Sequence, residues 1–420
     1  MHVNRREWLA GAGAGMMVAT NGIAFVAPTA SAGDSALPPP ITRQERLARI
    51  AKAQALMAEH DIGAVLIESG PSLDYFTGVR WGRSERLTGT VIPVEGDPII
   101  VTPFFEKPSV EESLAVPAEV RTWHEDVEPL GVVADFLHEK RLADRPIGME
   151  ETNRYFIHDR LKAELPGARV VSANPVVRGC RMVKTASELA LMQAANDITL
   201  ASIGAVMGKV RPGMSERDVS DMLREEQIKR GGSGPWALVL FGAAAALPHG
   251  TGKPQKLEAG QVVLVDTGCS VHGYQSDISR TWVMGTPTAK QREVWNHMAE
   301  GQQVARRACI VGATCGSVDD AVRTYYESLG YGPDYALPGL SHRTGHGIGM
   351  QGHEPVNLVR GETEPLAPGM CFSNEPGLYL PGEFGIRLED CFHMTEGGPR
   401  WFTIPPTSID EPLGRSGASA

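Results

Sequence analysis

Hydrophobic residues follow two different periods along the first half of the chain, so helices and strands are expected to alternate there. Apolar positions recur at helical spacing over residues 47–57, and residues 132–142 show the same pattern. Short apolar runs, which are typical of buried strands, lie at residues 64–67, 91–94 and 99–101. We therefore predict an α/β domain over residues 42–180.

The second half contains one arrangement twice, a helix followed by two apolar strands around a turn. The capping-box spacing of Thr185-Ala-Ser-Glu188 predicts the helix that begins this region. The two units are a helix at 215–230 with strands at 262–283, and a helix at 317–330 with strands at 370–394. An internal duplication leaves such a pattern. We predict an α+β domain with an internal pseudo-twofold repeat over residues 181–405, followed by a tail at 406–420.

The first 32 residues have the pattern of a signal peptide. Arg5 and Arg6 precede a weakly apolar stretch rich in glycine and alanine, and Ala30-Ser31-Ala32 fits a small-x-small cleavage site. The paired arginines resemble a twin-arginine signal, which implies export to the periplasm or the outside of the cell. An uncleaved N-terminal anchor is the alternative. Residues 33–41, which contain three prolines, are expected to form a tether.

Composition excludes several classes of protein. The 40 Lys and Arg against 50 Asp and Glu leave a net charge of −10, which argues against a nucleic-acid binder. After residue 32 no apolar run reaches the ~18 residues of a membrane helix, so no stable membrane insertion is expected once the signal is removed. The six cysteines form no Cys-x-x-Cys pair, so a zinc knuckle is not expected, and we expect free buried thiols.

Four carboxylates occupy positions where buried strands should be apolar. Asp266 directly follows the apolar run at 262–265, and Asp277 lies 11 residues later, across a predicted turn. Glu375 and Glu389 repeat the arrangement with a separation of 14 residues. A carboxylate in such a place costs several kcal/mol unless it is paired or bound to metal. Ion pairs with nearby arginines are the alternative, but two matched pairs favour a metal site.

Three histidines strengthen this interpretation. His342, His346 and His353 lie within a glycine-rich stretch of 12 residues, and glycines on both sides of His346 leave little bulk to crowd a ligand. Four carboxylates and one imidazole, with no thiolate, favour Mn²⁺, Co²⁺ or Fe²⁺ over a structural zinc ion. Five ligands exceed what one catalytic ion would leave open, so two ions that share carboxylates are expected. Such a pair predicts hydrolysis of an amide.

These residues resemble the pita-bread metallohydrolases, which include methionine aminopeptidase, prolidase, aminopeptidase P and creatinase. The matching motifs are Asp266-Thr-Gly, Ser276-Asp277-Ile-Ser-Arg-Thr281, Gly345-His-Gly-Ile-Gly349, Asn374-Glu-Pro-Gly377 and Gly385-Ile-Arg-Leu-Glu389-Asp390. Tyr75-Phe-Thr-Gly78 resembles the creatinase-type N-terminal domain of the proline-directed members. The resemblance implies a creatinase-type domain at 42–180 and a pita-bread catalytic domain at 181–405.

The resemblance also implies two divalent metal ions, Mn²⁺ or Co²⁺ first, with Fe²⁺ or Zn²⁺ as alternatives. Asp266 would bind one ion, and Asp277 and Glu389 would bridge both. His346 and Glu375 would complete the second ion. Creatinase lacks this set of ligands, whereas this chain has all five. Metal-free hydrolysis of creatine is therefore not expected.

Catalytic roles follow from the same resemblance. Glu375 would act as the proton shuttle, and His249 and His353 would bind the substrate carbonyl and stabilise the tetrahedral intermediate. His342 matches a further histidine of the proline-specific members.

Three residues are expected to bind substrate or to support those that do. Arg387 would orient carboxylates, and Tyr379 would donate a further hydrogen bond. Trp81, together with Arg83, is a candidate to close the site from a neighbouring subunit, and an ordinary place in a surface loop is the alternative.

The expected function is hydrolysis of the Xaa-Pro bond by a dinuclear metallopeptidase, in which a hydroxide held between the ions attacks the scissile carbonyl. The two-domain layout and His342 favour cleavage before proline, and the short spacing from Glu375 to Glu389 favours a dipeptidase (prolidase). Short proline-containing peptides are the expected substrates, and a homodimer or higher homo-oligomer is expected. The alternatives are a Xaa-Pro aminopeptidase acting on longer peptides, an ectoine-type amidohydrolase on the same fold, and a silent binding protein.

Overall fold

The computed structural model describes residues 37–419, and residues 37–420 form one compact unit. The expected signal peptide at 1–32 and the first residues of the expected tether lie outside the described residues. The domain boundaries derived from the sequence stay predictions.

The N-terminal domain is built on a mixed six-stranded sheet with the strand order β4-β3-β2-β1-β5-β6. The strands are β1 (Ala64–Glu68), β2 (Gly89–Pro93), β3 (Ile99–Pro103), β4 (Glu119–Trp123), β5 (Ile147–Met149) and β6 (Val170–Ser172). The helices are α1 (Arg43–Glu59), α2 (Pro71–Thr77), α3 (Lys107–Ser113), α4 (Pro129–Glu139), α5 (Tyr155–Glu164) and α6 (Asn174–Arg181). The three strands expected from apolar runs are present.

Both faces of this sheet are buried, which explains why its strands are apolar throughout rather than alternating. On β1, Val65 and Ile67 belong to a hydrophobic cluster with α1 and α6, whereas Ala64 and Leu66 belong to another with α4 and α5. Successive side chains of a strand point to opposite faces, so each face receives every second residue.

The C-terminal domain contains two larger antiparallel sheets, two small two-stranded sheets and four long helices. One sheet has the order β10-β8-β7, with β9 paired to β8, and the other has the order β12-β11-β13-β16-β17. The strands are β7 (Ser233–Phe241), β8 (Val262–Val271), β9 (Tyr274–Gln275), β10 (Ile278–Val283), β11 (Gly345–Gly347), β12 (Glu354–Leu358), β13 (Cys371–Asn374), β16 (Asp390–Thr395) and β17 (Gly398–Trp401). The helices are α7 (Ala186–Met207), α8 (Glu216–Lys229), α9 (Ala289–Ala308) and α10 (Cys315–Ser328).

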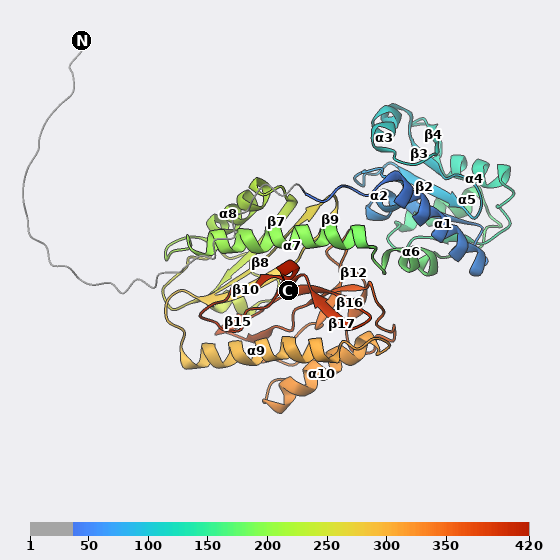
Figure 1. Cartoon of the computed structure of the whole chain (residues 1–420). Coiled ribbons are helices and arrows are strands. Elements are labelled where there is room, and N and C mark those ends of the chain that lie inside the picture. Colours follow the sequence, from blue (N-terminus) through green and yellow to red (C-terminus); the bar gives the residue numbers. More distant parts are fainter. Residues whose placement is uncertain (1–36, 420) are drawn as a thin grey trace, which may run out of the picture. The chain divides into compact units, whose positions relative to one another are not determined.

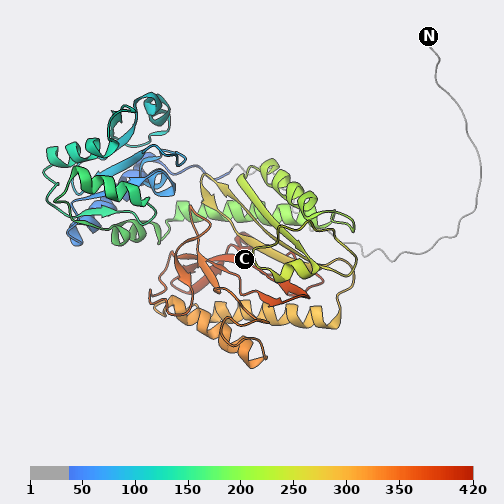
Figure 2. The same ribbon diagram turned by 180° about the vertical axis from the view of Figure 1, so that it is seen from behind.

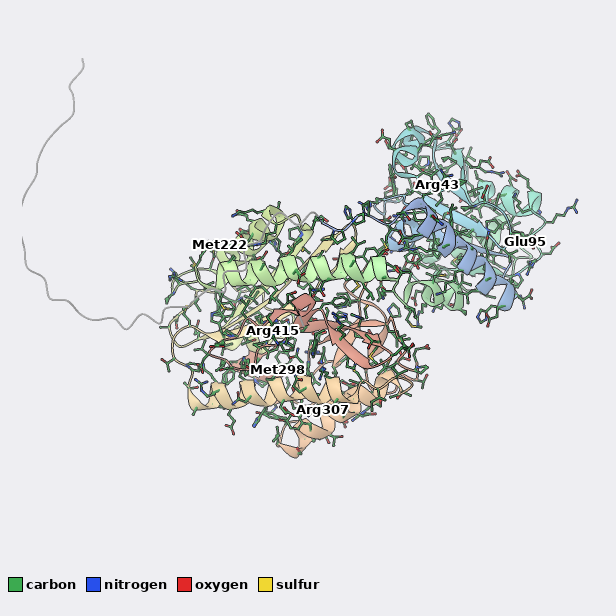
Figure 3. All side chains as sticks on the ribbon, in the orientation of Figure 1. Arg43, Glu95, Met222, Met298, Arg307 and Arg415 are labelled. Atoms are coloured by element: carbon green, nitrogen blue, oxygen red, sulfur yellow. The ribbon has the colours of Figure 1, made fainter. Side chains whose placement is uncertain are left out.

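The sheets of this domain lie between two pairs of helices (Figures 1 and 2). Helices α7 and α8, drawn in green, contact the first sheet, and α9 and α10, drawn in orange, lie on the other side. In Figure 3, Met298 lies on the side of α9 that faces the strands, where it is fully buried. A helix pair with an antiparallel sheet thus occurs twice, as the sequence repeat predicts.

Helix α7 begins at the predicted capping box. The Thr185 side chain accepts a hydrogen bond from the Glu188 backbone, and the Glu188 carboxylate accepts one from the Thr185 N–H at 2.7 Å. Helix α10 begins two residues before the predicted position, because Thr314 is its N-cap. Helix α7 is the one described helix long and apolar enough to cross a membrane, but 56% of that stretch is buried within the protein, which fits a core helix.

The hairpins that carry the acidic residues differ in their turns. In the first, His272 and Gly273 form the turn between β8 and β9, and both have positive φ. The second contains an additional small hairpin, β14 (Leu378–Leu380) with β15 (Phe384–Ile386), between β13 and β16. The two units therefore share their order of elements but not their turns.

The segment after residue 405 folds back onto the catalytic domain. Strand β19 (Arg415–Ser416) pairs with β18 (Thr403–Ile404). Arg280 donates to the Leu413 carbonyl oxygen at 2.6 Å, and Arg292 forms an ion pair with Asp410 at 2.6 Å.

Buried ion pairs join the two domains. Arg49 of α1 contacts Glu188 of α7 at 3.0 Å, and Arg181, at the end of α6, contacts Glu354. The six cysteines are all buried and free, as expected from the sequence.

Candidate metal centre

Three neighbouring strands bring carboxylates from distant parts of the sequence together. Asp266 on β8 lies opposite Ser279 on β10, and Ser279 forms a bridge with Glu389, the residue before β16. The Glu389 N–H donates to the Ser279 carbonyl oxygen at 3.0 Å. Asp277 directly precedes β10, and carboxylate oxygens of Asp266, Asp277 and Glu389 lie within 4.8 Å of one another.

His346 and Glu375 complete a second group with Glu389. His346 lies at the centre of β11, and Glu375 directly follows β13. Nε2 of His346 lies 3.3 Å from Glu375 Oε1, 3.8 Å from Glu389 Oε1 and 3.7 Å from Asp277 Oδ2. The structure therefore brings all five sequence-predicted ligands together as two groups that share Glu389. Their binding of metal stays a prediction.

The glycines on both sides of His346 are required by the close packing of strands. A Cβ atom at Gly345 would lie 2.2 Å from the carbonyl oxygen of Ser373, and one at Gly347 would lie 2.5 Å from that of Glu354. The His346 N–H donates to Ser373 Oγ at 3.0 Å. Glycine therefore lets β11 pair closely on both sides and hold the imidazole beside the carboxylates.

The buried carboxylates have too few partners within the protein. Asp266 Oδ1, Asp277 Oδ1 and Glu389 Oε1 are buried without a hydrogen-bond partner in residues 37–419. Burial, and then repulsion from Asp266 and Glu375, raises the pKa of Asp277. Burial, and then repulsion from Asp277 and Glu375, raises the pKa of Glu389. Divalent cations would supply the missing partners and remove the repulsion, so these residues fit two hard metal ions.

Arg387 orients the carboxylates on one side of the cluster. Its Nη2 donates to Asp266 Oδ2 at 2.7 Å, and its Nε donates to Ser279 Oγ at 3.0 Å. Ser279 Oγ–H in turn donates to Glu389 Oε2 at 2.9 Å. One guanidinium therefore holds two of the expected ligands, directly and through a serine.

Tyr379 and His342 extend this hydrogen-bond chain. Arg387 Nη1 donates to the Tyr379 hydroxyl oxygen at 3.0 Å, and the hydroxyl proton is donated to His342 Nε2 at 2.8 Å. His342 Nδ1–H donates to the Arg343 carbonyl oxygen at 2.8 Å. Both ring nitrogens of His342 are thus occupied, and burial lowers its pKa. His342 therefore orients the hydroxyl group of Tyr379.

His353 and His249 lie at the open side of the cluster. The ring of His353 lies 4.0 Å from that of His346, between centroids. A cavity of about 270 Å³ reaches His353 and is otherwise lined by residues 150–152, 177, 178, 181, 182, 351, 354 and 355. His249 is exposed in the turn that follows the short 3-10 helix Gly242–Ala246, and Arg387 Nη1 anchors this turn through the Pro248 carbonyl oxygen at 3.2 Å.

The structure does not bring Trp81 into the cluster. Trp81 is half-buried and packs against the hydrophobic core that includes the inner face of β1. Arg83 donates to the Ser69 carbonyl oxygen at 3.0 Å and to Thr152 Oγ1 at 2.7 Å, both within its own chain. Closure of a neighbouring subunit's site by these residues stays a prediction.

The sequence predicted Arg387 as a residue that orients carboxylates, but it did not single out Ser279 or Arg343. Ser279 lies within the motif Ser276-Asp277-Ile-Ser-Arg-Thr281, but its polar neighbours Arg280 and Thr281 gave no reason to single it out. Arg343, next to His342, contacts His353 but carried no signal that sets it apart from other arginines.

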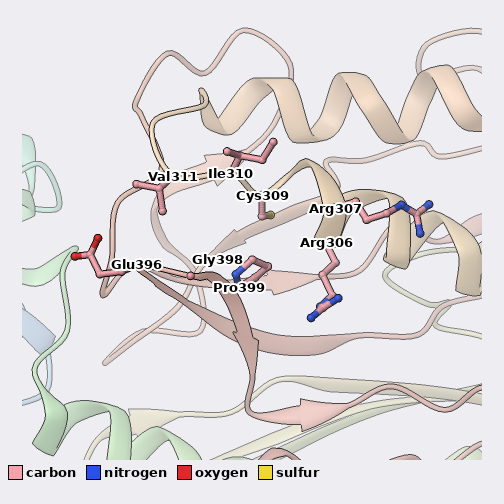
Figure 4. Close-up of a pocket in the computed structure, with 9 residues that line it drawn as sticks. Arg306, Arg307, Cys309, Ile310, Val311, Glu396, Gly398 and Pro399 are labelled. Carbon is pink, nitrogen blue, oxygen red and sulfur yellow. The ribbon is translucent and has the colours of Figure 1, made fainter.

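A second cavity lies away from this chemistry. It has a volume of about 430 Å³ and is lined by Arg306, Arg307 and Cys309 at the end of α9 and by the β16–β17 turn (Figure 4). None of the predicted site residues lines it. This cavity is therefore not part of the candidate metal centre.

A buried ion triplet holds the segment next to His353. Glu354 pairs with Arg181 and with Lys184, and all three side chains are less than a tenth exposed. Burial raises the pKa of Glu354, but the two cations outweigh burial and lower it to about 2. The ionised carboxylate therefore stabilises the fold at neutral pH.

Glu354→Gln is expected to lower the free energy of unfolding at pH 7 by about 3 kcal/mol. Because the pKa of the folded state lies below the ordinary value of 4.5, this stabilisation is present above about pH 4.5 and is lost as the pH falls toward 2. Urea unfolding at pH 7 and pH 3 measures the free energy of unfolding of both proteins. The difference between wild type and Glu354→Gln should be smaller at pH 3. Glu112→Gln, at an exposed position of α3, is the control. An equal difference at both pH values would contradict the prediction.

Comparisons with known proteins agree with this geometry. Residues 190–396 match metallopeptidase family M24, and residues 49–183 match the creatinase/prolidase N-terminal domain. The probable dipeptidase PepE of Mycobacterium tuberculosis is 33% identical over 359 residues, which cover 83% of this chain and 92% of that protein. The Xaa-Pro dipeptidase of Pyrococcus furiosus is 29% identical over 366 residues, which cover 86% and 98%.

The solved structures include dipeptidase PepE from Mycobacterium ulcerans, with a TM-score of 0.81 and 31% identity, covering 88% of this chain and 98% of that one. The family expected from the sequence motifs and its fold are thereby confirmed. The chain belongs to metallopeptidase family M24 and carries the creatinase/prolidase N-terminal domain.

Proposed function

We propose that this metallopeptidase hydrolyses the Xaa-Pro bond of dipeptides. The observation that carries the proposal is the pair of ligand groups that share Glu389, with carboxylate oxygens left without partners in residues 37–419. The relative from Pyrococcus furiosus, named a Xaa-Pro dipeptidase, matches over both domains and supports cleavage before proline.

Five residues would hold the two metal ions, for which we propose Mn²⁺ or Co²⁺. Asp266, Asp277 and Glu389 form one group, and His346, Glu375 and Glu389 form the other. When bound, such ions polarise the scissile carbonyl and activate water near neutral pH. The oxygen-rich donor set with one imidazole suits these metals, and Fe²⁺ and Zn²⁺ are the alternatives.

The protein's own groups position the substrate and move the proton. Glu375 is more accessible than Glu389, with 14% of its side chain exposed against 2%, so it is the carboxylate able to exchange a proton with the leaving amine. His353 and His249, at the open side, can donate hydrogen bonds to an oxygen that becomes negative in the transition state. Arg387 keeps Asp266 and, through Ser279, Glu389 in place during the reaction.

The test uses mature protein without residues 1–32, stripped of metal and reloaded with Mn²⁺ or Co²⁺. A Xaa-Pro dipeptide, a Xaa-Pro-Xaa tripeptide and ectoine are assayed side by side. We expect metal-dependent cleavage of the dipeptide and little cleavage of the tripeptide. Preferential cleavage of the tripeptide would make the protein an aminopeptidase, and cleavage of ectoine alone would make it an amidohydrolase. No turnover of any of them by metal-loaded protein would overturn the proposal.

Export and oligomerisation are part of the same proposal. We propose that the predicted signal peptide directs export of the protein to the periplasm or the outside of the cell. Arg5→Lys combined with Arg6→Lys is expected to retain the precursor in the cytoplasm, which cell fractionation measures.

A homodimer or larger homo-oligomer is expected for the mature chain, and analytical ultracentrifugation checks it.

A further inference from the structure

The backbone around His353 is held in place by Glu354. Glu354 Oε1 accepts the N–H of Gln351 at 3.1 Å, while Arg181 and Lys184 neutralise the carboxylate. The loop that carries His353 is thereby tied to the end of α6. The orientation and protonation of the exposed imidazole must come from other contacts.

Two neighbours face the imidazole of His353. On one side lies His346, an expected metal ligand, at 4.0 Å between ring centroids. On the other side, Arg343 Nη2 lies 3.1 Å from His353 Nδ1. Arg343 is half-buried and forms no ion pair with a carboxylate in the part of the chain that the structure describes. Its hydrogen bond to His353 is therefore not weakened by competition from an acidic partner.

The chemistry of the two groups settles which nitrogen carries the proton. A guanidinium has only N–H donors and stays protonated, so it cannot accept a hydrogen bond. Nδ1 of His353 must then be the acceptor and must lack a proton. We infer that Arg343 holds His353 as the neutral tautomer with its proton on Nε2, so that His353 acts as a hydrogen-bond donor and not as a metal ligand.

The tautomer of His353 decides whether this residue can bind a metal ion. A ring nitrogen of His353 lies within 4.8 Å of ligand atoms of Asp277 and His346, which is close enough for a third, nitrogen-containing metal group. Metal coordination requires a nitrogen lone pair. Arg343 occupies the lone pair on Nδ1, and the proton occupies the one on Nε2. His353 then has one free function, an Nε2–H that can donate a hydrogen bond.

The effect of this tautomer on turnover rests on the proposed function, but the tautomer itself does not. A neutral Nε2–H donor can stabilise a developing oxyanion without first gaining a proton. Arg343 is thus a positioning residue that acts through His353.

The experiment reads the tautomer directly by ¹⁵N NMR of the imidazole rings in histidine-labelled mature protein. Spectra are taken of metal-free protein and of protein loaded with Zn²⁺, a diamagnetic ion, and His353→Gln identifies the signal by its absence. We expect His353 to show a protonated Nε2 and an unprotonated, hydrogen-bonded Nδ1 in both states. A proton on Nδ1 of His353, or coordination of Zn²⁺ by His353, would overturn the inference. Spectra of the wild-type protein are sufficient for this test.

Variants of Arg343 test its part. Arg343→Met removes the donor, so His353 should become a mixture of tautomers or coordinate Zn²⁺. Arg343→Lys retains a cationic donor and should retain the wild-type tautomer. Arg217→Met, at an exposed position of α8, is the matched control and should change nothing. An unchanged His353 signal in Arg343→Met, or an equal change in Arg217→Met, would contradict the assignment.

Kinetics separate this inference from the proposed function. Arg343→Met should lower kcat for the Xaa-Pro dipeptide by about 10–100-fold, with KM less affected and bound metal unchanged, and Arg343→Lys should restore most of the loss. Failure of the wild-type protein to cleave any peptide would refute the proposed function and leave the NMR result to decide the tautomer.

Discussion

Asp277→Asn is expected to lower kcat/KM on a Xaa-Pro dipeptide by at least ~10⁴-fold, because residues that act as one catalytic unit lose nearly all activity when one is removed. Asp277, like Glu389, is a buried carboxylate that lies near both Asp266 and His346. Its oxygens lie within 4.8 Å of those of Asp266 and Glu389, and Oδ2 lies 3.7 Å from His346 Nε2. An amide at this position cannot supply the negative charge that two cations need.

The same substitution should have the opposite effect on stability without metal. Burial and the nearby carboxylates raise the pKa of Asp277, so its ionised form destabilises the metal-free fold at neutral pH. The neutral amide removes that cost. In excess chelator, Asp277→Asn should therefore melt at a higher temperature than wild type, whereas Mn²⁺ should stabilise wild type far more than the variant.

Thermal unfolding with chelator and with Mn²⁺, together with the metal content of each protein, measures both effects. Asp97→Asn, at an exposed position between β2 and β3, is the control and should match wild type in every assay. Activity within tenfold of wild type, or unchanged metal content, would contradict the assignment of Asp277.

Glu375→Gln is expected to lower kcat by ~10²–10⁴-fold even at saturating metal, the range for loss of a general acid–base group. The Glu375 N–H donates to the Thr344 carbonyl oxygen at 2.8 Å, and its side chain lies beside His346. Burial raises the pKa of Glu375, but the hydrogen bond and charge of His346 outweigh burial and hold the pKa below its usual range in the metal-free protein. The carboxylate is thus ionised and can accept a proton, which the isosteric amide cannot do.

Steady-state kinetics over a range of Mn²⁺ concentrations separates the two roles of Glu375. Loss of the ligand should raise the metal concentration required, and loss of the proton carrier should lower kcat at the plateau. Glu396→Gln, at the exposed β16–β17 turn, is the matched control. A variant that regains wild-type kcat when Mn²⁺ is raised would show that Glu375 binds metal without moving a proton.

The five candidate ligands could be predicted because each departs from its local pattern. Asp266 lies on a strand whose preceding four residues are buried and apolar, and His346 lies between glycines that β11 requires for close pairing. Such departures are costly without a compensating contact. The local sequence therefore indicates which side chains are unusual for their position, but it does not show which other side chains they contact.

The connections among these residues could not be predicted. Arg387 contacts Asp266 across 121 positions of the sequence, and Ser279 contacts Glu389 across 110. These contacts depend on the register of β8, β10 and β16, and a shift of one residue would turn every side chain to the other face. Trp81 packs against the hydrophobic core of its own chain, and its closure of a neighbouring subunit's site stays a prediction.

Residue type, spacing and the cost of burying charge were enough to predict the family, a two-domain fold and a set of candidate metal ligands. Folding establishes how these groups act on one another: Glu389 lies in both ligand groups, both ring nitrogens of His342 are occupied, and Arg343 faces His353. Hydrogen bonds and charge repulsion act over a few ångströms in space, and the separation of two residues in the sequence contains no information on that distance.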